Sequence, residues 1–375
     1  MKRICIVTAV PATINAFLKE HILILSEYYN LTVVTTVTKS SNVKVPDNVK
    51  LISLDIVRDI SIVNDIKSLL ALNALFRREK FDLVLSVTPK AGLLSALAGC
   101  FARVEYRTHW FTGQVWVTQT GFKRALLKSV DKLLASCISD ALIDSQSQFD
   151  FLINENVLKA EKGIVLGSGS ICGVNLNRFK FDADVKHLYR QKIGLTNADK
   201  VLLFLGRLNS DKGVLDLVNS FHHVVSQIDN LHLVLVGPDE QNIEKSLADA
   251  GRLHERIHFT GGTVEPEKWL SIADVFCLPS YREGFGSSVI EAAAIGLPAI
   301  TSRIYGLTDA VVEGETGLMH QVGNIEEISD TIKKIVENDT LRKYLGENAR
   351  KRAEASFGQE YVSNLLLQYV NERLK

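Results

Sequence analysis

The feature that most constrains how this chain can fold is a regular alternation of two kinds of segment. Short runs of apolar, mostly β-branched residues are separated by longer stretches with the 3.6-residue period of an amphipathic helix. The runs predicted to be strands are Ile4–Val7, Leu31–Thr36, Leu83–Ser86, Leu142–Asp144, Gly163–Leu166, Val201–Leu205, Leu231–Val236, Ile257–Phe259, Val275–Leu278 and Ala299–Thr301. Helical periodicity is clearest in Phe17–Tyr28, Ser61–Phe76, Gly121–Cys137 and Val214–Ser226. Because such alternation builds βαβ units, we predict an α/β fold with parallel sheets buried on both faces.

The length and one interruption of the pattern indicate two domains. A chain of 375 residues exceeds the usual size of a single hydrophobic core. We predict Rossmann-like, doubly wound domains at 1–175 and 195–355, joined by a polar linker at 176–194. Residues 356–375 have helical periodicity and are predicted to pack back on the N-terminal domain. Ligands of doubly wound sheets lie beyond the carboxyl ends of the strands, so we expect a central cleft between the domains.

Composition disfavours several classes of protein. No run of about 18 apolar residues occurs, so no membrane-spanning helix is expected, and Met1–Val7 lacks the long apolar core of a signal peptide. The five cysteines are scattered and have no C-x-x-C spacing. This pattern disfavours zinc and disulfides and is typical of the reducing cytoplasm. Nucleic acid is also disfavoured, because dense basic tracts and aromatic–basic repeats are missing.

Charge is distributed unevenly along the chain, although basic and acidic residues balance at 43 each. Residues 1–190 carry 24 basic and 17 acidic residues, whereas residues 191–375 carry 19 and 26. Two interpretations remain open. The first half meets an anionic surface or acceptor, or the two domains simply differ in composition.

A turn with two cations follows the predicted strand Val201–Leu205. Gly206 permits a sharp turn and a close approach of ligand to backbone. Arg207 can fork onto paired oxygens, and Lys212 supplies a point charge, which together suit a diphosphate. The alternative is a solvated turn whose cations pair with a nearby Asp.

A glycine-rich turn, P-S-Y-R-E-G-F-G, follows the predicted strand Val275–Leu278, and a helix is expected to begin near Ser287. The first N–H groups of a helix are unpaired and its dipole is positive there, which favours phosphate binding. Ser287 or Ser288 can cap the helix or donate to phosphate. Glu283 precedes the turn, and Glu291 lies one helical turn inside. Carboxylates accept pairs of hydrogen bonds from vicinal hydroxyls, so a sugar and a ribose are natural targets.

Three motifs together carry a resemblance to a known family. They are G-R-L-x-x-x-K-G at 206–213, P-S-x-x-E-G-F-G-x-x-x-x-E-A-x-A-x-G-x-P at 279–298, and D-A-V-x-x-G-x-T-G-L at 309–318. This part of the chain resembles the retaining glycosyltransferases of family 4, which have the GT-B fold. In the first half, Thr88–Gly92 and Arg107–Trp116 resemble the bacterial members that build capsule, O-antigen or other lipid-linked glycans.

The resemblance implies a role for each matching position. Arg207 and Lys212 hold the nucleotide diphosphate and stabilise its charge as it leaves, while Glu283 contacts the donor sugar. His109 lies near the reaction centre, with a packed histidine beside Trp110 as the alternative. The positions implied to bind the nucleotide sugar are Gly206, Gly284, Phe285, Gly286, Ser287, Ser288 and Glu291.

The chemistry implied by the resemblance needs neither a metal nor a cofactor. The two cations replace a divalent ion in stabilising the leaving diphosphate. Retention of anomeric configuration in the family is generally attributed to attack on the same face of the sugar, with the leaving phosphate accepting the acceptor's proton. Glu283 is therefore not required as a covalent nucleophile.

The acceptor side is less well defined. The implied acceptor residues are Pro11, Thr13, Lys90 and Arg107. The loop Thr8–Thr13 lacks the glycine pair that many family members carry there, which leaves the acceptor mode open. A polyprenyl diphosphate-linked glycan is the expected acceptor.

The predicted helix Gly121–Cys137 has two readings. One face carries Phe122, Leu126, Val130, Leu133 and Cys137, and another carries Arg124, Lys128 and Lys132. Such a helix can lie on an anionic bilayer, or it can bury its apolar face in the core and keep its basic face in water. We predict peripheral contact with the cytoplasmic face of the inner membrane.

The sequence thus predicts a retaining, metal-independent glycosyltransferase that moves a hexose or N-acetylhexosamine from a nucleotide diphosphate sugar, UDP first among them, to a lipid-linked saccharide. Two alternatives are a GT-B-fold nucleotide-sugar epimerase and a non-catalytic partner subunit. The intact E-G-F-G…E pattern and the retained cations argue against both.

Overall fold

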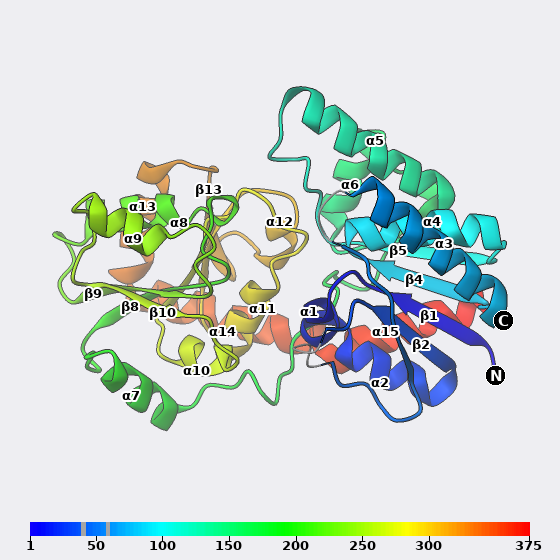
Figure 1. Cartoon of the computed structure of the whole chain (residues 1–375). Helices are drawn as coiled ribbons and strands as arrows, with labels where there is room; N and C mark the ends of the chain where they lie inside the picture. The colour runs from blue at the N-terminus through cyan, green and yellow to red at the C-terminus, as the bar shows by residue number, and fades with distance from the viewer. Residues whose placement is uncertain (39–42, 58–60) are drawn as a thin grey trace. The chain divides into compact units, whose positions relative to one another are not determined.

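The computed structural model describes residues 1–38, 43–57 and 61–375 (Figure 1). It divides into two compact units. Unit 1 comprises Met1–Gly173 and Gln359–Lys375, and unit 2 comprises Val174–Gly358. Each unit is a parallel sheet covered by helices on both faces, so the predicted fold class is confirmed.

Unit 1 is built on a seven-stranded sheet. Its strands are β1 (Arg3–Val7), β2 (Asn30–Thr35), β3 (Lys50–Ser53), β4 (Leu83–Val87), β5 (Tyr106–Phe111), β6 (Asp140–Ile143) and β7 (Gly163–Val165). They are arranged in the order β3-β2-β1-β4-β5-β6-β7, and every pairing is parallel.

Helices cover both faces of this sheet because successive side chains of a strand point to opposite faces. The helices are α1 (Pro11–Thr13), α2 (Lys19–Tyr28), α3 (Ile62–Glu79), α4 (Pro89–Ala102), α5 (Gly121–Cys137), α6 (Gln146–Asn154) and α15 (Gln359–Arg373), with a π-helical turn at Ile14–Leu18 and a 3-10 turn at Ala160–Lys162. Ile4 and Ile6 belong to a core shared with α2 and α15. Cys5 and Val7 belong to a second core, shared with α3 and α4. The C-terminal helix α15 thus lies in unit 1 against α2, and its Tyr369 hydroxyl is 2.8 Å from Thr108 Oγ1.

Unit 2 is built on a six-stranded parallel sheet in the order β10-β9-β8-β11-β12-β13. Its strands are β8 (Lys200–Leu205), β9 (Leu231–Val236), β10 (Ile257–Gly261), β11 (Val275–Leu278), β12 (Ala299–Ser302) and β13 (Gly317–His320). Its helices are α7 (Ala183–Lys192), α8 (Val214–Val224), α9 (Ile243–Asp249), α10 (Pro266–Ser271), α11 (Ser287–Ile295), α12 (Leu307–Ala310), α13 (Ile325–Val336) and α14 (Asp339–Ser356), with a 3-10 turn at Ser210–Lys212. One continuous apolar core fills the unit.

The segment 176–194 is not the linker that the sequence predicts. It carries α7 and belongs to unit 2. Arg190 of α7 is buried, donates to the carbonyl oxygen of Ile272, and pairs with Asp274 at 2.9 Å. The segment is polar because the outer face of α7 lies in water and because Arg190 is charged. The carboxylate that pairs with Arg190 belongs to Asp274, far along the chain.

All ten predicted strands are present, and three further strands escaped prediction. β3 is an edge strand with mostly exposed side chains, so it lacks a buried apolar run. β5 contains Arg107 and His109, whose polarity hides the strand pattern. β13 is only four residues long and begins with Gly317.

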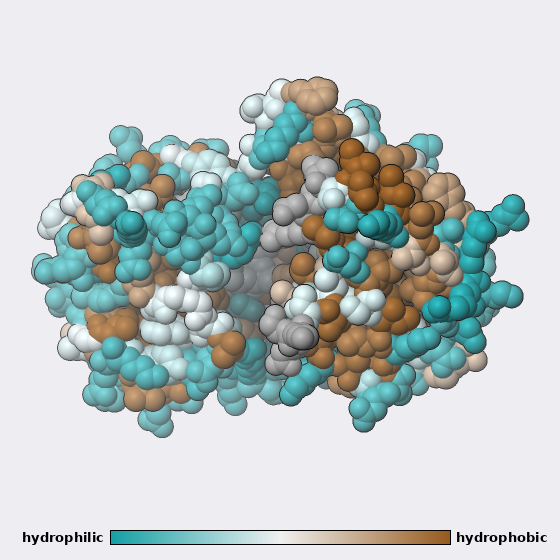
Figure 2. Space-filling model, viewed as in Figure 1, coloured by the Kyte–Doolittle hydropathy of each residue, from teal (hydrophilic) through white to brown (hydrophobic). Residues whose placement is uncertain are grey.

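Each sheet has one point where the strand order reverses. It lies between β1 and β4 in unit 1 and between β8 and β11 in unit 2. Loops that leave adjacent strands in opposite directions open a crevice at this point, which is where doubly wound sheets bind ligands. The two motif loops of unit 2 follow β8 and β11. On the molecular surface, apolar side chains gather over part of unit 1 (Figure 2).

Candidate functional site

The loop after β8 is held against the loop after β11 by a close backbone contact. Gly213 has a φ of +67°, and a Cβ atom there would lie 2.0 Å from the carbonyl oxygen of Pro279. Only glycine satisfies both conditions. The Tyr281 N–H donates to the Asp211 carbonyl oxygen at 2.8 Å, and Arg282 pairs with the Asp211 carboxylate at 2.9 Å. The fold therefore joins two motifs that lie more than sixty residues apart in the chain.

An ion pair between Lys212 and Glu283 lies across this junction. Ser280 Oγ donates to Glu283 Oε1 at 2.9 Å. The two charged side chains are only 17% and 12% exposed, so they are held in a partly desolvated position rather than free in water. A cation and an acid that the sequence singled out in separate motifs are thus brought into contact.

Arg207 faces a partner that sequence reasoning missed. Its guanidinium group lies 3.1 Å from Glu240, and the Asn209 side chain donates to the same carboxylate at 2.7 Å. Asn209 also accepts from the Lys212 N–H at 3.2 Å, which shapes the turn between the two cations. Glu240 follows the neighbouring strand β9, so the signal that could have identified it is its place just beyond a strand end next to β8.

The glycine-rich turn after β11 leads directly into α11, which begins at Ser287 as predicted. Gly286 is the N-cap residue and provides no capping side chain. Phe285 is buried and packs edge-on against Phe357, so only its backbone is available to a ligand. A Cβ atom at Gly306 would lie 2.4 Å from the Gly284 carbonyl oxygen, so the segment before α12 supports the turn from behind. Ser287 and Ser288 lie half-buried in the first turn of the helix.

Glu291 lies further along α11 with a strongly perturbed carboxyl group. Burial raises the pKa of Glu291 to about 7, while the charges of Arg178 and Glu267 lower and raise it respectively. These two neighbours pair with each other at 2.8 Å and were not identified from the sequence. A carboxyl group that is poorly solvated without a ligand is suited to accept hydrogen bonds from hydroxyls that a ligand brings.

His109 is packed inside unit 1. It lies within β5 and is 2% exposed, and its Nδ1 atom and the Ser86 hydroxyl share a hydrogen bond of 3.0 Å. A Cβ atom at Gly92 would lie 2.3 Å from His109 Cε1, so α4 lies directly on the ring. Burial lowers the pKa of His109 to about 3, which keeps the imidazole neutral. His109 thus has the environment of a packed histidine, which was the alternative interpretation of the sequence. Its role near the reaction centre stays a prediction.

The four predicted acceptor residues are not brought together. Pro11 begins α1 just after β1, and Lys90 lies in the first turn of α4 just after β4, so both are near the reversal point of the sheet. Lys90 pairs with Asp65 at 2.7 Å, and Thr13 is buried. Arg107 is the second residue of β5, near the amino-terminal ends of the strands. Its Nε atom donates to the Cys137 carbonyl oxygen at 2.7 Å. Arg107 therefore ties α5 to the sheet.

Comparison with known proteins agrees with the motifs. Residues 185–352 match the family described as glycosyl transferases group 1. Over 323 residues, the chain is 33% identical to the capsular polysaccharide biosynthesis glycosyltransferase CapM of Staphylococcus aureus, with 85% of this chain and 84% of that protein covered. The chain belongs to the group 1 glycosyl transferases. The resemblance to bacterial glycosyltransferases that the sequence motifs indicated is therefore confirmed.

This glycosyltransferase has further relatives. It is 28% identical to the N,N'-diacetylbacillosaminyl-diphospho-undecaprenol alpha-1,3-N-acetylgalactosaminyltransferase of Campylobacter jejuni, with 81% of this chain and 79% of that one covered. The structure of Anabaena HepE in complex with UDP and glucose matches with a TM-score of 0.80 at 16% identity, covering 99% of this chain and 100% of that one. The structural likeness shows a shared fold, which is GT-B.

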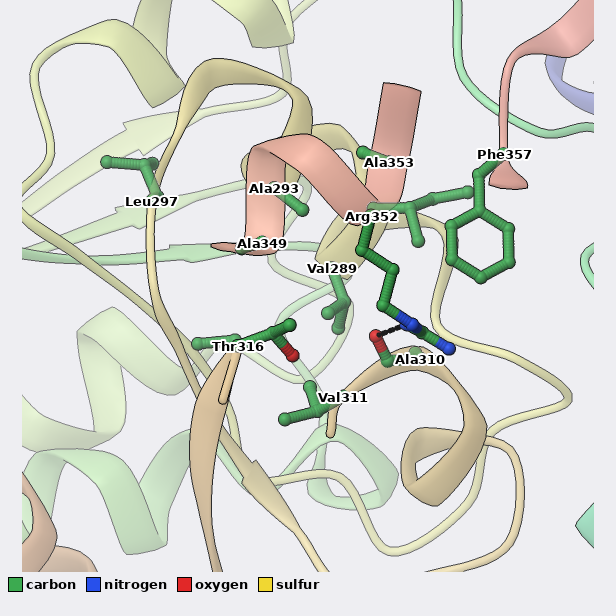
Figure 3. Close-up of a pocket in the computed structure, with 12 residues that line it drawn as sticks. Val289, Ala293, Leu297, Ala310, Val311, Thr316, Ala349, Arg352, Ala353 and Phe357 are labelled. Carbon is green, nitrogen blue, oxygen red and sulfur yellow. Dashed lines mark hydrogen bonds between the residues drawn. The ribbon is translucent and has the colours of Figure 1, made fainter. Parts of the chain in front are cut away.

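A small cavity in unit 2 of the glycosyltransferase is a packing gap rather than a substrate site. It lies between α11 and α14, and Figure 3 shows mostly apolar side chains around it. Its volume of about 10 Å³ admits at most one water molecule. Arg352 donates to the Ala310 carbonyl oxygen at 2.7 Å beside it and so ties α14 to α12.

The structure leaves the predicted independence from metal as a prediction. Within residues 1–38, 43–57 and 61–375, no three His, Cys, Asp or Glu side chains are grouped as metal ligands would be. The same residues contain no helix with both the length and the apolar character needed to cross a bilayer.

Proposed function

We propose that this glycosyltransferase moves a hexose or N-acetylhexosamine from a UDP-sugar to a lipid-linked saccharide during assembly of a surface polysaccharide, with retention of configuration and without a metal ion. The observation that carries the proposal is the contact between Lys212 and Glu283, which joins the loops after β8 and β11 where the strand order reverses. The structure of HepE with UDP and glucose supports a UDP-sugar as the first donor to test.

The donor diphosphate is proposed to bind beside Arg207 and Lys212, before the N-terminus of α11. Without ligand, each cation faces a carboxylate, Glu240 or Glu283. A diphosphate carries more charge than one carboxylate and can take over these contacts. The first turn of α11 adds N–H groups and a positive dipole end, and its N-cap residue Gly286 has no side chain to occupy these N–H groups.

Each acid then has a separate task. When the diphosphate binds Lys212, the carboxylate of Glu283 becomes available to the hydroxyls of the donor sugar. Glu291 accepts hydrogen bonds from the ribose hydroxyls. Cleavage of the anomeric bond places negative charge on the diphosphate, and preorganised cations stabilise that charge most effectively in a poorly solvated site. Attack from the face that the diphosphate leaves accounts for retention without a covalent enzyme intermediate.

The lipid-linked acceptor is proposed from the names of the relatives and from the reversal point of unit 1. CapM is named for capsular polysaccharide biosynthesis, and the Campylobacter enzyme for a diphospho-undecaprenol acceptor. In unit 1, α4 begins at this point, with Pro89 and Lys90 in its first turn. Thr88, a β-branched residue, has a φ of +76° at its N-cap, and strain of this kind clusters at functional sites.

A donor and acceptor screen tests the proposal. The full chain is incubated with UDP- and GDP-sugars, with and without a polyprenyl diphosphate-linked saccharide and with and without EDTA. We expect transfer only with acceptor present, unchanged rates in EDTA, and an anomeric configuration in the product, measured by NMR, that equals that of the donor. Sugar isomerisation without acceptor would support an epimerase, and loss of activity in EDTA or an inverted product would contradict the stated mechanism.

A further inference from the structure

The apolar face of α5 points away from the protein. Phe122 is 83% exposed, and Leu126 and Leu133 are each about half exposed. The buried side of the helix instead carries Asp131 and Leu134. The prediction that the apolar face packs in the core is therefore wrong for Phe122, Leu126 and Leu133, although Lys132 of the basic face does lie in water.

The reason lies in the polar residues on the inner side of α5. The Trp116 Nε1–H donates to Asp131 at 2.7 Å. Arg124 and Lys128 pair with Glu155 and lie 5.2 and 5.7 Å from the centre of the Trp116 ring. These contacts hold Arg124 and Lys128 against the protein, and the opposite, apolar side of the helix faces outward.

The helix α3 also exposes apolar side chains, although its buried side is apolar as well. Ile66 and Leu70 are 52% and 61% exposed, and Ile62 and Val63 precede them on the outer side. Leu72 and Leu75 face the core. Both α3 and α5 pack against α4, one on each side, and their buried residues belong to cores on the same face of the sheet. Their outer sides therefore point in the same general direction, and Figure 2 shows apolar side chains gathered over this part of unit 1.

The charges beside these apolar side chains indicate which kind of partner the surface would bind. The three carboxylates of α3 and α5 all have partners: Asp65 pairs with Lys90, Glu79 with Lys50, and Asp131 with Trp116. Three exposed lysines, Lys67, Lys123 and Lys132, have no ion-pair partner among the described residues. An apolar surface that is edged by lysines, with every carboxylate of α3 and α5 paired, is complementary to an anionic bilayer, because apolar side chains enter the interface and lysines reach the headgroups.

We propose that the outer sides of α3 and α5 form one bilayer-docking surface, called here the α3–α5 face. It consists of Ile62, Val63, Ile66, Leu70, Phe122, Leu126 and Leu133, with Lys67, Lys123 and Lys132 as its cations. Arg124 and Lys128 take no part in it. The inference does not depend on which sugar is transferred, since it concerns a surface of unit 1 rather than the donor site.

Flotation with vesicles that contain neither donor nor acceptor tests this surface. Vesicles of phosphatidylglycerol mixed with phosphatidylcholine are compared with pure phosphatidylcholine. We expect the full chain to float with the anionic vesicles and high salt to weaken binding. The double variants Ile66→Glu/Leu70→Glu and Phe122→Glu/Leu126→Glu should each lower the partition coefficient by about tenfold or more.

A matched control uses exposed apolar residues of unit 2. Leu188 and Tyr344 are each 51% exposed, so Leu188→Glu/Tyr344→Glu makes the same chemical change elsewhere, and this variant should bind as the parent does. Melting temperatures confirm that all variants are folded. The inference is overturned if the parent does not bind, if all variants bind alike, or if light scattering shows a dimer that the α3 and α5 variants dissociate. The last result would assign the face to a second copy of the chain.

Discussion

A Cβ atom at Gly213 would lie 2.0 Å from the carbonyl oxygen of Pro279, so the loop after β8 rests directly on the backbone of the loop after β11. This contact sets the distance between the cations of one motif and the acid of the other. The geometry of the proposed donor site therefore depends on a residue that touches no substrate.

Gly213→Ala should be more damaging than the loss of glycine flexibility alone. Gly314 is the matched control, because its φ is +76° and a Cβ atom there would meet nothing within 4 Å. We expect Gly314→Ala to cost about 1 kcal/mol of unfolding free energy, and Gly213→Ala to cost clearly more and to weaken UDP binding. Denaturant unfolding and calorimetric titration measure the two effects. Equal losses in the two variants would show that the backbone contact is unimportant.

Replacing either cation should slow turnover. We expect Arg207→Ala to lower kcat by roughly 100-fold or more if the guanidinium group stabilises the leaving diphosphate. Arg303→Ala is the control, since Arg303 pairs with Glu313 at 3.0 Å with an exposure similar to that of the pair between Arg207 and Glu240. Its kcat should stay near that of the parent.

Lys212→Ala should have a comparable effect on kcat, but it also leaves Glu283 without its partner in a poorly solvated position. The double variant Lys212→Met/Glu283→Gln removes both charges and should recover stability without recovering kcat. Recovery of both would mean that the pair is structural only.

The pH dependence of nucleotide binding should report on Glu291. Its pKa is raised from the ordinary value of 4.5 to about 7. If the carboxylate accepts hydrogen bonds from ribose, UDP affinity should fall as the pH drops below about 7, and Glu291→Gln should weaken binding and flatten the profile. Glu244→Gln, an exposed change in α9, should leave the profile as it is. A parent profile that is flat between about pH 6 and 8 would contradict the assignment.

The same pKa shift predicts the sign of a stability effect. The folded state binds the Glu291 proton more tightly than the unfolded state does, so this group's contribution to stability falls as the pH rises from about 4.5 to about 7. Glu291→Gln should therefore stabilise the chain above pH 7, by roughly 1–3 kcal/mol, and have little effect below the lower value. Thermal unfolding at the two pH extremes measures the difference.

The pair of Gly92 and His109 separates a packing role from a catalytic one. Glycine to alanine within a helix normally adds about 1 kcal/mol of stability. Gly92→Ala should instead destabilise the chain, because its Cβ atom would lie 2.3 Å from the imidazole ring. His109→Ala should recover part of that loss in the double variant. If His109→Ala lowers kcat strongly and leaves stability unchanged, the packing role is refuted.

Periodicity was sufficient for most of the fold but not for β5. Most of the ten predicted strands are runs of apolar residues buried on both sides, such as Leu231–Val236, and no other local structure accommodates such a run so well. Strand β5 carries the half-buried Arg107, which donates to the Cys137 carbonyl oxygen, and the buried His109, which is hydrogen-bonded to the Ser86 hydroxyl. Those partners lie more than twenty residues away in the chain, so no local pattern could reveal the strand.

The candidate donor site could also be predicted only in part from the sequence. Arg207, Lys212, Glu283 and Glu291 could be identified from the sequence because each lies just after a strand or at a helix start, where the local pattern is informative. Their partners could not. Glu240 contacts Arg207 only because β9 lies beside β8 in the sheet. Lys212 contacts Glu283 only because β11 lies on the other side of β8.

The sequence by itself determined that α5 is an amphipathic helix with one apolar and one basic side, because that follows from the 3.6-residue period alone. Only the tertiary structure decided which side faces outward. The pairing of Asp131 with Trp116 and of Arg124 and Lys128 with Glu155 turns these three charged side chains toward the protein and leaves Phe122 and Leu126 in water. The orientation of a helix depends on the groups that the rest of the fold offers to each of its sides, and its own period contains no information about them.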